Sequence, residues 1–262
     1  MPAEATASRI AAAAQRRFGA ALEVPADLAH LDVLAALNER SVCRRYRSDP
    51  VPEALVRLLC ATALSAPTKS DLQQASLIRV ADAAKRAAIC ALLPGSPWLE
   101  RAPELFVFCA DGWRLRRLFA RKGVEFPNEH LDAFFNATVD AALALGAFVC
   151  AAEMLGLGTC PISQVRDHAQ RIDELLALPD WVVPVAGLAL GYAQAKEPLS
   201  ARLSLCATVH TDRYDVDAVE RELQAYDARR GRDWSGDKVK QYSRVMRADF
   251  GAYVGRKRFR LG

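Results

Sequence analysis

The chain has 262 residues, of which 52% are hydrophobic and 25% are charged, and its formal net charge is +4. This size and composition favour one ordinary globular domain, or one domain with appendages. The charge excess is too small to argue for nucleic-acid binding, but it is compatible with an anionic small-molecule ligand.

Helical patterns and short apolar runs alternate in the first 110 residues. We predict a strand at residues 76–80, and a buried central strand at 105–110, because that apolar run is too short for a helix. A basic, extended segment spans residues 40–47, and a loop spans 66–73. Helices are predicted at residues 8–18, 31–37, 52–64 and 83–92.

The dominant predicted element is a helix at residues 128–155, with Asn128 as its N-cap and Gly156 as its stop. Its apolar side chains recur every three or four positions, so we expect it to be buried on most sides, at the centre of a domain or at a dimer interface. The stripe consists of Leu131, Phe135, Thr138, Ala142, Leu145, Val149 and Ala152.

After this helix come an apolar strand at residues 182–190 and an amphipathic helix at 216–230. The tail from residue 233 is basic and aromatic without a core stripe, so we expect it to pack on another subunit. Few strands separated by helices predict an α+β layered domain. We divide the chain into an N-terminal helical extension (1–30), a central domain (31–232) and the C-terminal tail (233–262).

Seven cysteines, an odd number without a CxxC spacing, lie mostly in apolar runs. They favour free thiols in a reducing cytosol, so we expect a cytoplasmic protein. The four histidines are scattered, and no metal site is predicted. Residues 1–14 lack the apolar core of a secretory signal, and no run reaches the roughly 18 apolar residues of a membrane span.

The chain lacks a GxGxxG after a strand, a GxxxxGK[ST], a GxSxG and an HExxH. Four other segments are candidates for chemistry. The arginines and serine of residues 40–46 suit phosphate, or form a solvated surface. The donor-rich residues 65–73 form a binding loop or an ordinary connection. The glycines of residues 156–163 admit a flat ligand or end a helix. Arg202 follows a strand and loop.

Together these segments resemble the nitroreductase family, in the branch of oxygen-insensitive nitroreductases and bacterial NAD(P)H:flavin oxidoreductases. The similarity runs from about Leu34 to the C-terminus. Its markers, in order, are residues 40–46 with 49–51, 65–73, 106–111, 139–140, 152–158, 187–191 and 234–235. Their order and spacing make the resemblance specific, and it implies a mostly antiparallel sheet surrounded by helices in an intertwined homodimer.

The resemblance also implies a non-covalent FMN. By matching position, its phosphate and ribityl chain are held by Arg40, Ser41, Arg44 and Arg202. The partner subunit contributes Pro67, Thr68, Lys69, Ser70 and Gln73. A backbone N–H at Ser163, flanked by Pro161 and Ile162, meets flavin N5. Substrate-binding positions are Ser96, Trp98, Arg166 and Arg247; the two arginines match positions that face a nicotinamide nucleotide, or they are surface residues.

The sequence departs from the branch at several of these positions. One extra residue separates Arg40-Ser41 from Arg44, so either arginine can take the main phosphate role. Ser163-Gln164 stand where Gly-Gly is common, Ser200 where a lysine is, and Ser96 where some members have a glutamine. These departures leave the substrate range open.

The implied reaction is a ping-pong hydride transfer from NAD(P)H through flavin N5 to a nitroaromatic, quinone or flavin acceptor. Because the flavin supplies the chemistry, no catalytic acid or base is predicted. Two alternatives remain: a specialised FMN enzyme that oxidises a biosynthetic intermediate without NAD(P)H, and a non-catalytic flavin-binding protein.

Overall fold

The computed structural model describes residues 3–25 and 27–260. Contacts within the chain define two compact units. Unit 1 comprises Met1–Ser41 and Lys196–Met246, and unit 2 comprises Val42–Ala195 and Arg247–Gly262. The domain boundaries expected from the sequence stay a prediction, and residues 1–2, 26 and 261–262 within them lie outside the described residues.

Unit 2 is built on an antiparallel sheet, which confirms the predicted fold class. In the described part of the chain, four strands pair in the order β1-β2-β4-β3, and all neighbours are antiparallel. The strands are β1 (Ala75–Arg79), β2 (Glu104–Asp111), β3 (Leu157–Ile162) and β4 (Val182–Tyr192). The inner strands β2 and β4 are the two predicted apolar runs. Strand β3 is not predicted, because its glycine and proline resemble a helix stop, yet an edge strand tolerates proline.

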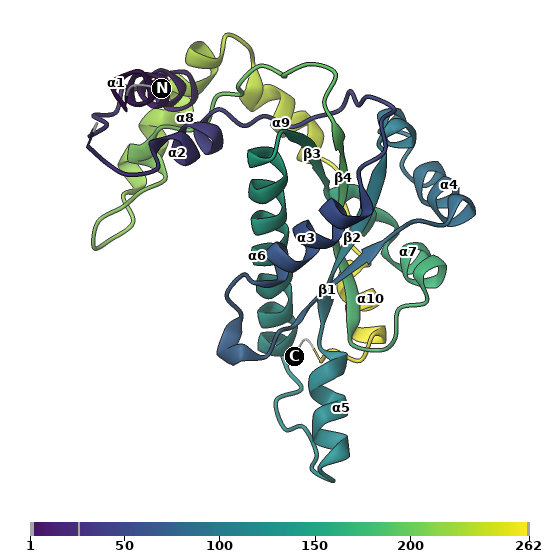
Figure 1. The fold of residues 1–262 in the computed structure, drawn as a ribbon. Helices are drawn as coiled ribbons and strands as arrows, with labels where there is room; N and C mark the ends of the chain where they lie inside the picture. The colour runs from purple at the N-terminus through teal and green to yellow at the C-terminus, as the bar shows by residue number, and fades with distance from the viewer. Residues whose placement is uncertain (1–2, 26, 261–262) are drawn as a thin grey trace. The chain divides into compact units, whose positions relative to one another are not determined.

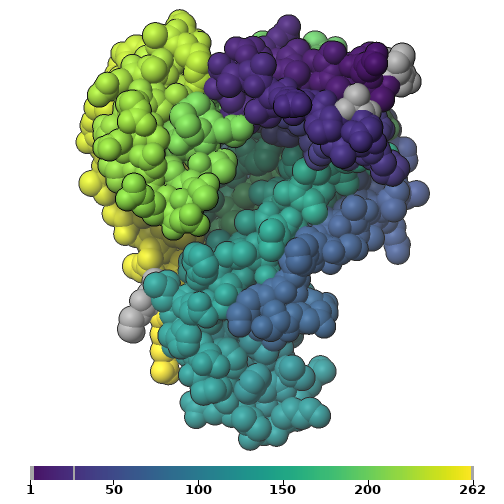
Figure 2. Space-filling model, turned by 90° about the vertical axis from the view of Figure 1, so that its left-hand side faces the viewer, coloured from purple at the N-terminus to yellow at the C-terminus, as the bar shows by residue number. Residues whose placement is uncertain are grey.

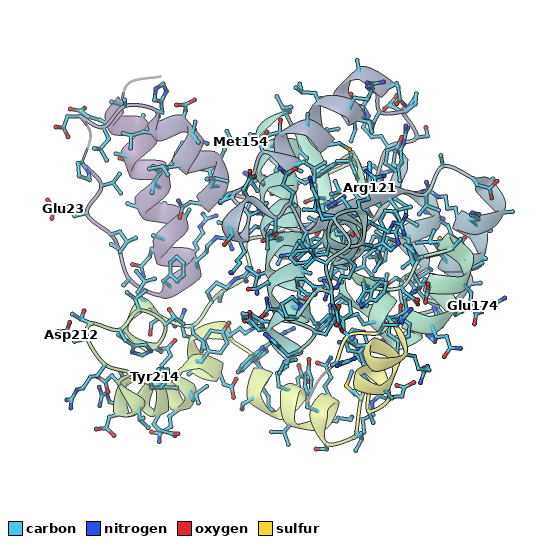
Figure 3. The ribbon with its side chains drawn as sticks, turned by 90° about the horizontal axis from the view of Figure 1, so that it is seen from below. Glu23, Arg121, Met154, Glu174, Asp212 and Tyr214 are labelled. Atoms are coloured by element: carbon cyan, nitrogen blue, oxygen red, sulfur yellow. The ribbon has the colours of Figure 1, made fainter. Side chains whose placement is uncertain are left out.

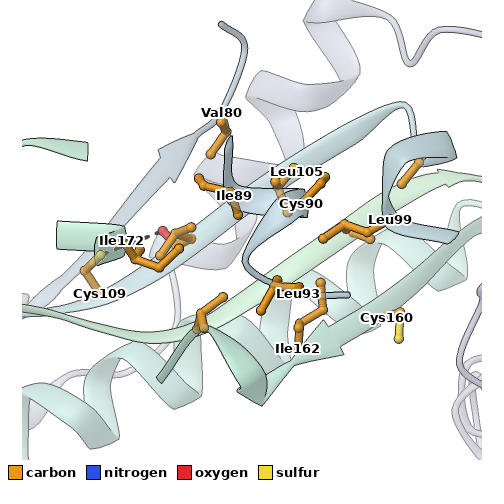
Figure 4. Close-up of a cluster of buried hydrophobic side chains, with 14 of the residues drawn as sticks. Val80, Ile89, Cys90, Leu93, Leu99, Leu105, Cys109, Cys160, Ile162 and Ile172 are labelled. Atoms are coloured by element: carbon orange, nitrogen blue, oxygen red, sulfur yellow. Dashed lines mark hydrogen bonds between the residues drawn. The ribbon is translucent and has the colours of Figure 1, made fainter. Parts of the chain in front are cut away.

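Helices cover both faces of this sheet (Figure 1). They are α3 (Glu53–Leu64), α4 (Ala83–Ala91), α6 (Leu131–Met154), α7 (Ala169–Leu176) and α10 (Phe250–Arg256), whereas α5 (Trp113–Arg121) projects beyond the end of the sheet. Further 3₁₀ turns lie at Lys69–Asp71, Pro97–Arg101 and Ser163–His168. Successive residues of β2 point to opposite faces. Leu105 and Cys109 pack into one core with α4 and α7 (Figure 4). Phe106 and Phe108 pack into a second core with α3 and α6.

Helix α6 packs against β2 and α3 with only part of the face predicted from its sequence. Val149 and Ala152 of the predicted stripe are buried, but the N-terminal part of the stripe is not. Small side chains such as Ala137, Ala141 and Ala144 face the core, where they allow close approach to the sheet. Leu131 and Phe135, expected in the buried stripe, are 53% and 61% exposed within one chain. By length and composition alone α6 is apolar enough to cross a membrane, but its contacts with the sheet account for its apolar core face.

The second half of the C-terminal tail packs within its own unit. Tyr253 and Phe259 are buried in a cluster with Val183. The N–H of Trp181 donates to the carbonyl of Lys257 at 2.8 Å. The expectation that these tail aromatics lack a core of their own is therefore wrong, because β4 and α7 supply one.

Unit 1 consists of α1 (Ala3–Phe18), α2 (Leu31–Asn38), α8 (Val216–Arg230) and α9 (Trp234–Tyr242), with a 3₁₀ turn at Leu205–Ala207. Ile10 of α1 packs with Leu31 of α2. Helix α8 has the predicted bounds, because the Asp215 carboxylate accepts the N–H of Ala218 and so caps its first turn. The exposed loop before α8 includes Tyr214, at the outer edge of unit 1 (Figure 3).

Candidate functional site

The basic segment after α2 runs beside the ends of β3 and β4. In unit 2, the N–H of Cys43 donates to the Thr159 carbonyl at 2.7 Å, and the N–H of Arg47 donates to the Tyr192 carbonyl at 2.8 Å. In this segment Cys43 and Tyr46 are buried, while Arg44 between them is exposed. Among the described residues, no carboxylate forms an ion pair with Arg44. This segment therefore presents a cation outward, as a phosphate contact requires.

The glycines at the start of β3 have structural roles. A Cβ at Gly158 would lie 2.6 Å from the sulfur of Cys43, so only glycine lets the basic segment approach the strand. Gly156, at the end of α6, has a φ of 81°, and a Cβ added there would meet no atom within 4 Å. Of the two alternatives left open by the sequence, a helix stop therefore accounts for Gly156.

Buried Tyr46 anchors the same segment from within the core. Its hydroxyl donates to the Cys43 carbonyl at 2.7 Å, and its ring lies 6.5 Å from that of Trp98. Burial, followed by the nearby thiols of Cys43 and Cys160, raises the pKa of the Tyr46 hydroxyl above its ordinary range. Tyr46 therefore stays a neutral hydrogen-bond donor at physiological pH.

In unit 1, the structure brings together two predicted phosphate-binding residues that are far apart in sequence. The carbonyl of Arg40 accepts a hydrogen bond from the Arg17 guanidinium. The N–H of Arg202 donates to the carbonyl of Arg17 at 2.6 Å. The exposed Arg202 side chain contacts the Ser200 hydroxyl at 2.7 Å, and within residues 3–25 and 27–260 no carboxylate pairs with it. Ser41, next to Arg40, is partly exposed.

The loop between α3 and β1 has a strained backbone. The φ angles of Ser70, Asp71 and Gln73 are positive, at 52°, 56° and 53°. Residues other than glycine rarely adopt such values. The carboxylate of Asp140 in α6 is 1% exposed. It accepts the N–H groups of Lys69 and Gln74, each at 2.9 Å, and so clamps both ends of the strained turn.

Two further contacts complete this loop. Arg114 of α5 donates to the carbonyls of Gln73 and Ala75. The N–H of Gln73 donates to the Thr68 hydroxyl at 3.3 Å. Together with Asp140, these residues line a cavity of about 170 Å³ beside the loop. The sequence does not predict the clamping roles of Asp140 and Arg114, although a carboxylate inside an apolar helix is a signal of a buried hydrogen-bonded group.

The segment expected along the flavin ring begins at the end of β3. Pro161 and Ser163 are exposed and Ile162 is buried, so their side chains alternate. The next residue, Gln164, accepts a hydrogen bond from the Ser96 hydroxyl at 3.0 Å. The structure thus places Ser96 beside the expected ring segment, but the residue is only 8% exposed and its hydroxyl is directed at Gln164.

The two arginines expected at the nicotinamide nucleotide lie near each other. Arg247 pairs with Asp167, and the Arg166 guanidinium donates to the Val185 carbonyl. Burial, and then the charge of Arg247, lower the pKa of Arg166. Arg166 also lines a cavity of about 190 Å³ against α10.

Across residues 3–25 and 27–260, no three histidine, cysteine, aspartate or glutamate side chains cluster in a way that could hold a metal ion. The seven cysteines are free thiols.

The chain is similar in sequence and in fold to several known proteins. A family model described as "Nitroreductase family" matches residues 37–192. An FMN reductase of Bacillus subtilis, named for NAD(P)H, is 31% identical over 236 residues, covering 82% of this chain and 92% of that protein. Oxygen-insensitive NADPH nitroreductase of Salmonella typhimurium is 34% identical over a match that covers 72% of this chain and 77% of that protein. The solved structure of the hypothetical oxidoreductase YcnD from Bacillus subtilis has a TM-score of 0.83 at 30% identity, covering 88% and 98%.

Proposed function

Because this chain belongs to the nitroreductase family, we propose that it is an FMN-dependent oxidoreductase that uses NAD(P)H to reduce a small-molecule acceptor. The observation that supports this most directly is the convergence of Arg40 and Arg202 on one buried residue of unit 1, with the Arg202 guanidinium exposed. Nitroaromatics, quinones and free flavin are the proposed acceptors, in line with the names of the relatives.

The residues present suit FMN in each unit considered by itself. In unit 1, Arg40, Ser41 and Arg202 offer guanidinium and hydroxyl donors to a phosphate. In unit 2, Arg44 adds an outward cation, and the polar loop carries Pro67, Thr68, Lys69, Ser70 and Gln73. Bound FMN supplies hydride acceptance and delivery at its N5 atom.

The protein's own contribution is binding and electrostatics. We propose that the backbone N–H of Ser163, next to Pro161 and Ile162, faces N5. Arg166 and Arg247 then attract the phosphates of the nicotinamide nucleotide, because guanidinium groups bind phosphate well. Ser96 and Trp98 border the acceptor. No side chain is assigned as a general acid or base.

We also propose a homodimer, from the exposed face of α6. Leu131, Phe135, Val139 and Leu143 follow one another at every fourth position and are all exposed in one chain. Figure 2 shows part of this surface in teal, beside α3 in blue. Gly146 continues the face, and a Cβ there would meet no atom within 4 Å. An exposed apolar stripe with a glycine suits close packing of a second helix.

The alternative of a specialised FMN enzyme rests on one contact. The Ser96 hydroxyl is directed at Gln164, so it is not offered to a ring or substrate in this arrangement. An enzyme of this kind would bind FMN but accept electrons from one biosynthetic intermediate. A cytoplasmic location stays part of the proposal and is supported by the free thiols.

Anaerobic stopped-flow mixing separates these functions. We expect the purified, yellow protein to bleach rapidly with NADPH or NADH, and to regain its colour on addition of a quinone or nitroaromatic. Recovery of FAD alone, or of no flavin after reconstitution, contradicts the proposal. Bound FMN that neither nucleotide reduces favours the specialised enzyme or the non-catalytic binder.

A further inference from the structure

Helix α1 precedes the residues matched by the family model, and its sequence suggests no role in the site. In its last turn, Arg17 is nonetheless buried, at 6% exposure. Buried guanidinium groups must be hydrogen-bonded, because an unpaired buried charge is strongly unfavourable. The partners of Arg17 therefore indicate what this side chain stabilises.

The guanidinium of Arg17 donates to backbone carbonyls on two separate segments of unit 1. Its Nε donates to Asn38 at 2.8 Å, and its Nη2 donates to Arg40. Its Nη1 reaches the Ser200 carbonyl at 3.4 Å. The main-chain carbonyl of Arg17 also accepts the N–H of Arg202 at 2.6 Å. One residue thus joins the backbones that carry both candidate phosphate-binding arginines.

Arg229 of α8 reinforces the same junction. Its guanidinium donates to the carbonyl of Arg17 at 3.2 Å and to that of Arg202 at 2.7 Å. The Glu222 carboxylate pairs with Arg229 and accepts the N–H of Ser204 at 2.8 Å. Gly19, with a φ of 76°, leaves room for Arg229, whose Cδ would lie 2.4 Å from an added Cβ. The path of Arg229 therefore depends on the glycine that ends α1.

We propose that Arg17 is a positioning residue for the flavin phosphate, and that α1 contributes it to the site. The planar fork of five N–H donors can reach several carbonyls at once, which a lysine ammonium on a flexible stem does not reproduce in the same geometry. Arg17 contacts the backbone of the segments that carry Arg40 and Arg202, so it acts through these two residues. This inference rests on the proposed FMN function.

The test compares FMN with riboflavin, which has the same ring and ribityl chain but no phosphate. Equilibrium dialysis of the full-length protein against each flavin gives two dissociation constants. We expect wild-type protein to prefer FMN. Arg17→Gln and Arg17→Lys should weaken FMN binding about tenfold and leave riboflavin binding unchanged. The preference for FMN over riboflavin, measured as the ratio of the two dissociation constants, should therefore fall about tenfold. Arg16→Gln is the matched control, because Arg16 is exposed on the same turn, and both constants should stay the same.

Each outcome has a distinct meaning. An unchanged FMN-to-riboflavin ratio in Arg17→Gln overturns the positioning role, and so does an equal loss for both flavins, which indicates a general loss of structure. A wild-type protein without any preference for FMN contradicts the phosphate site of the proposed function instead. If the Arg17 variants do not fold, Arg229→Met replaces them, because it removes two other hydrogen bonds of the same junction, those to the carbonyls of Arg17 and Arg202, and the same ratio decides.

Discussion

Asp140 is a buried carboxylate whose two oxygens hold a strained loop, so its replacement tests how that loop is stabilised. In Asp140→Asn the shape is kept, but one oxygen becomes an NH₂ group that faces the N–H of Lys69 or Gln74. Hydrogen bonds to a charged acceptor contribute roughly 1.5–3 kcal/mol. The left-handed residues Ser70, Asp71 and Gln73 each add strain of about 1–2 kcal/mol, which the hydrogen bonds to the carboxylate help to offset.

We therefore expect Asp140→Asn to lower the free energy of unfolding by about 2–3 kcal/mol. At roughly 2–4 °C per kcal/mol for a chain of this size, the midpoint of thermal unfolding falls by about 4–12 °C. Differential scanning calorimetry measures the shift, and fluorescence titration measures FMN affinity, which should also fall because the loop belongs to the proposed site.

Asp132→Asn is the control, since Asp132 is exposed in the first turn of the same helix and should change stability by less than about 1 kcal/mol. An Asp140→Asn protein with wild-type stability and wild-type FMN affinity would refute this account of the loop.

Three other predictions follow from particular side chains. Phe135→Glu places a charge on the exposed α6 stripe and should dissociate the dimer in light scattering; an unaltered dimer argues against this interface. Under native conditions iodoacetamide should modify exposed Cys206 before Cys109, because burial raises the pKa of the Cys109 thiol to about 12; peptide mass spectrometry shows the order, and early labelling of Cys109 contradicts it. Burial raises the pKa of Glu222, but hydrogen bonds from Ser204 and Arg229 outweigh it and lower the pKa overall. Its stabilisation is therefore present above the ordinary glutamate pKa of about 4.3 and is lost as the pH falls below it. In thermal melting curves from pH 6 to pH 3, the fall in unfolding midpoint with decreasing pH should be smaller for Glu222→Gln than for wild type.

Local pattern was sufficient for the elements whose conformation depends on their own residues. Helix α8 has the predicted bounds because Asp215 caps it and Gly231, with a φ of 68°, ends it. The inner strands β2 and β4 follow from short apolar runs, since a strand with both faces covered needs few polar side chains. The candidate site residues came from the family resemblance, which rests on short segments in a matching order along the chain. Their direct roles at the flavin stay predictions.

Other features depended on neighbours that no local pattern reveals. Which face of α6 is buried within one chain was decided by where alanines let the sheet approach, so Leu131 and Phe135 remain exposed although they fit the helical period. Strand β3 exists because β4 supplies its hydrogen-bond partners, despite Gly158 and Pro161. Arg17 in a surface-like Gln-Arg-Arg run gave no sign of burial. Its role follows from carbonyls at residues 38, 40 and 200, which only the folded backbone of unit 1 brings within reach of a single guanidinium group.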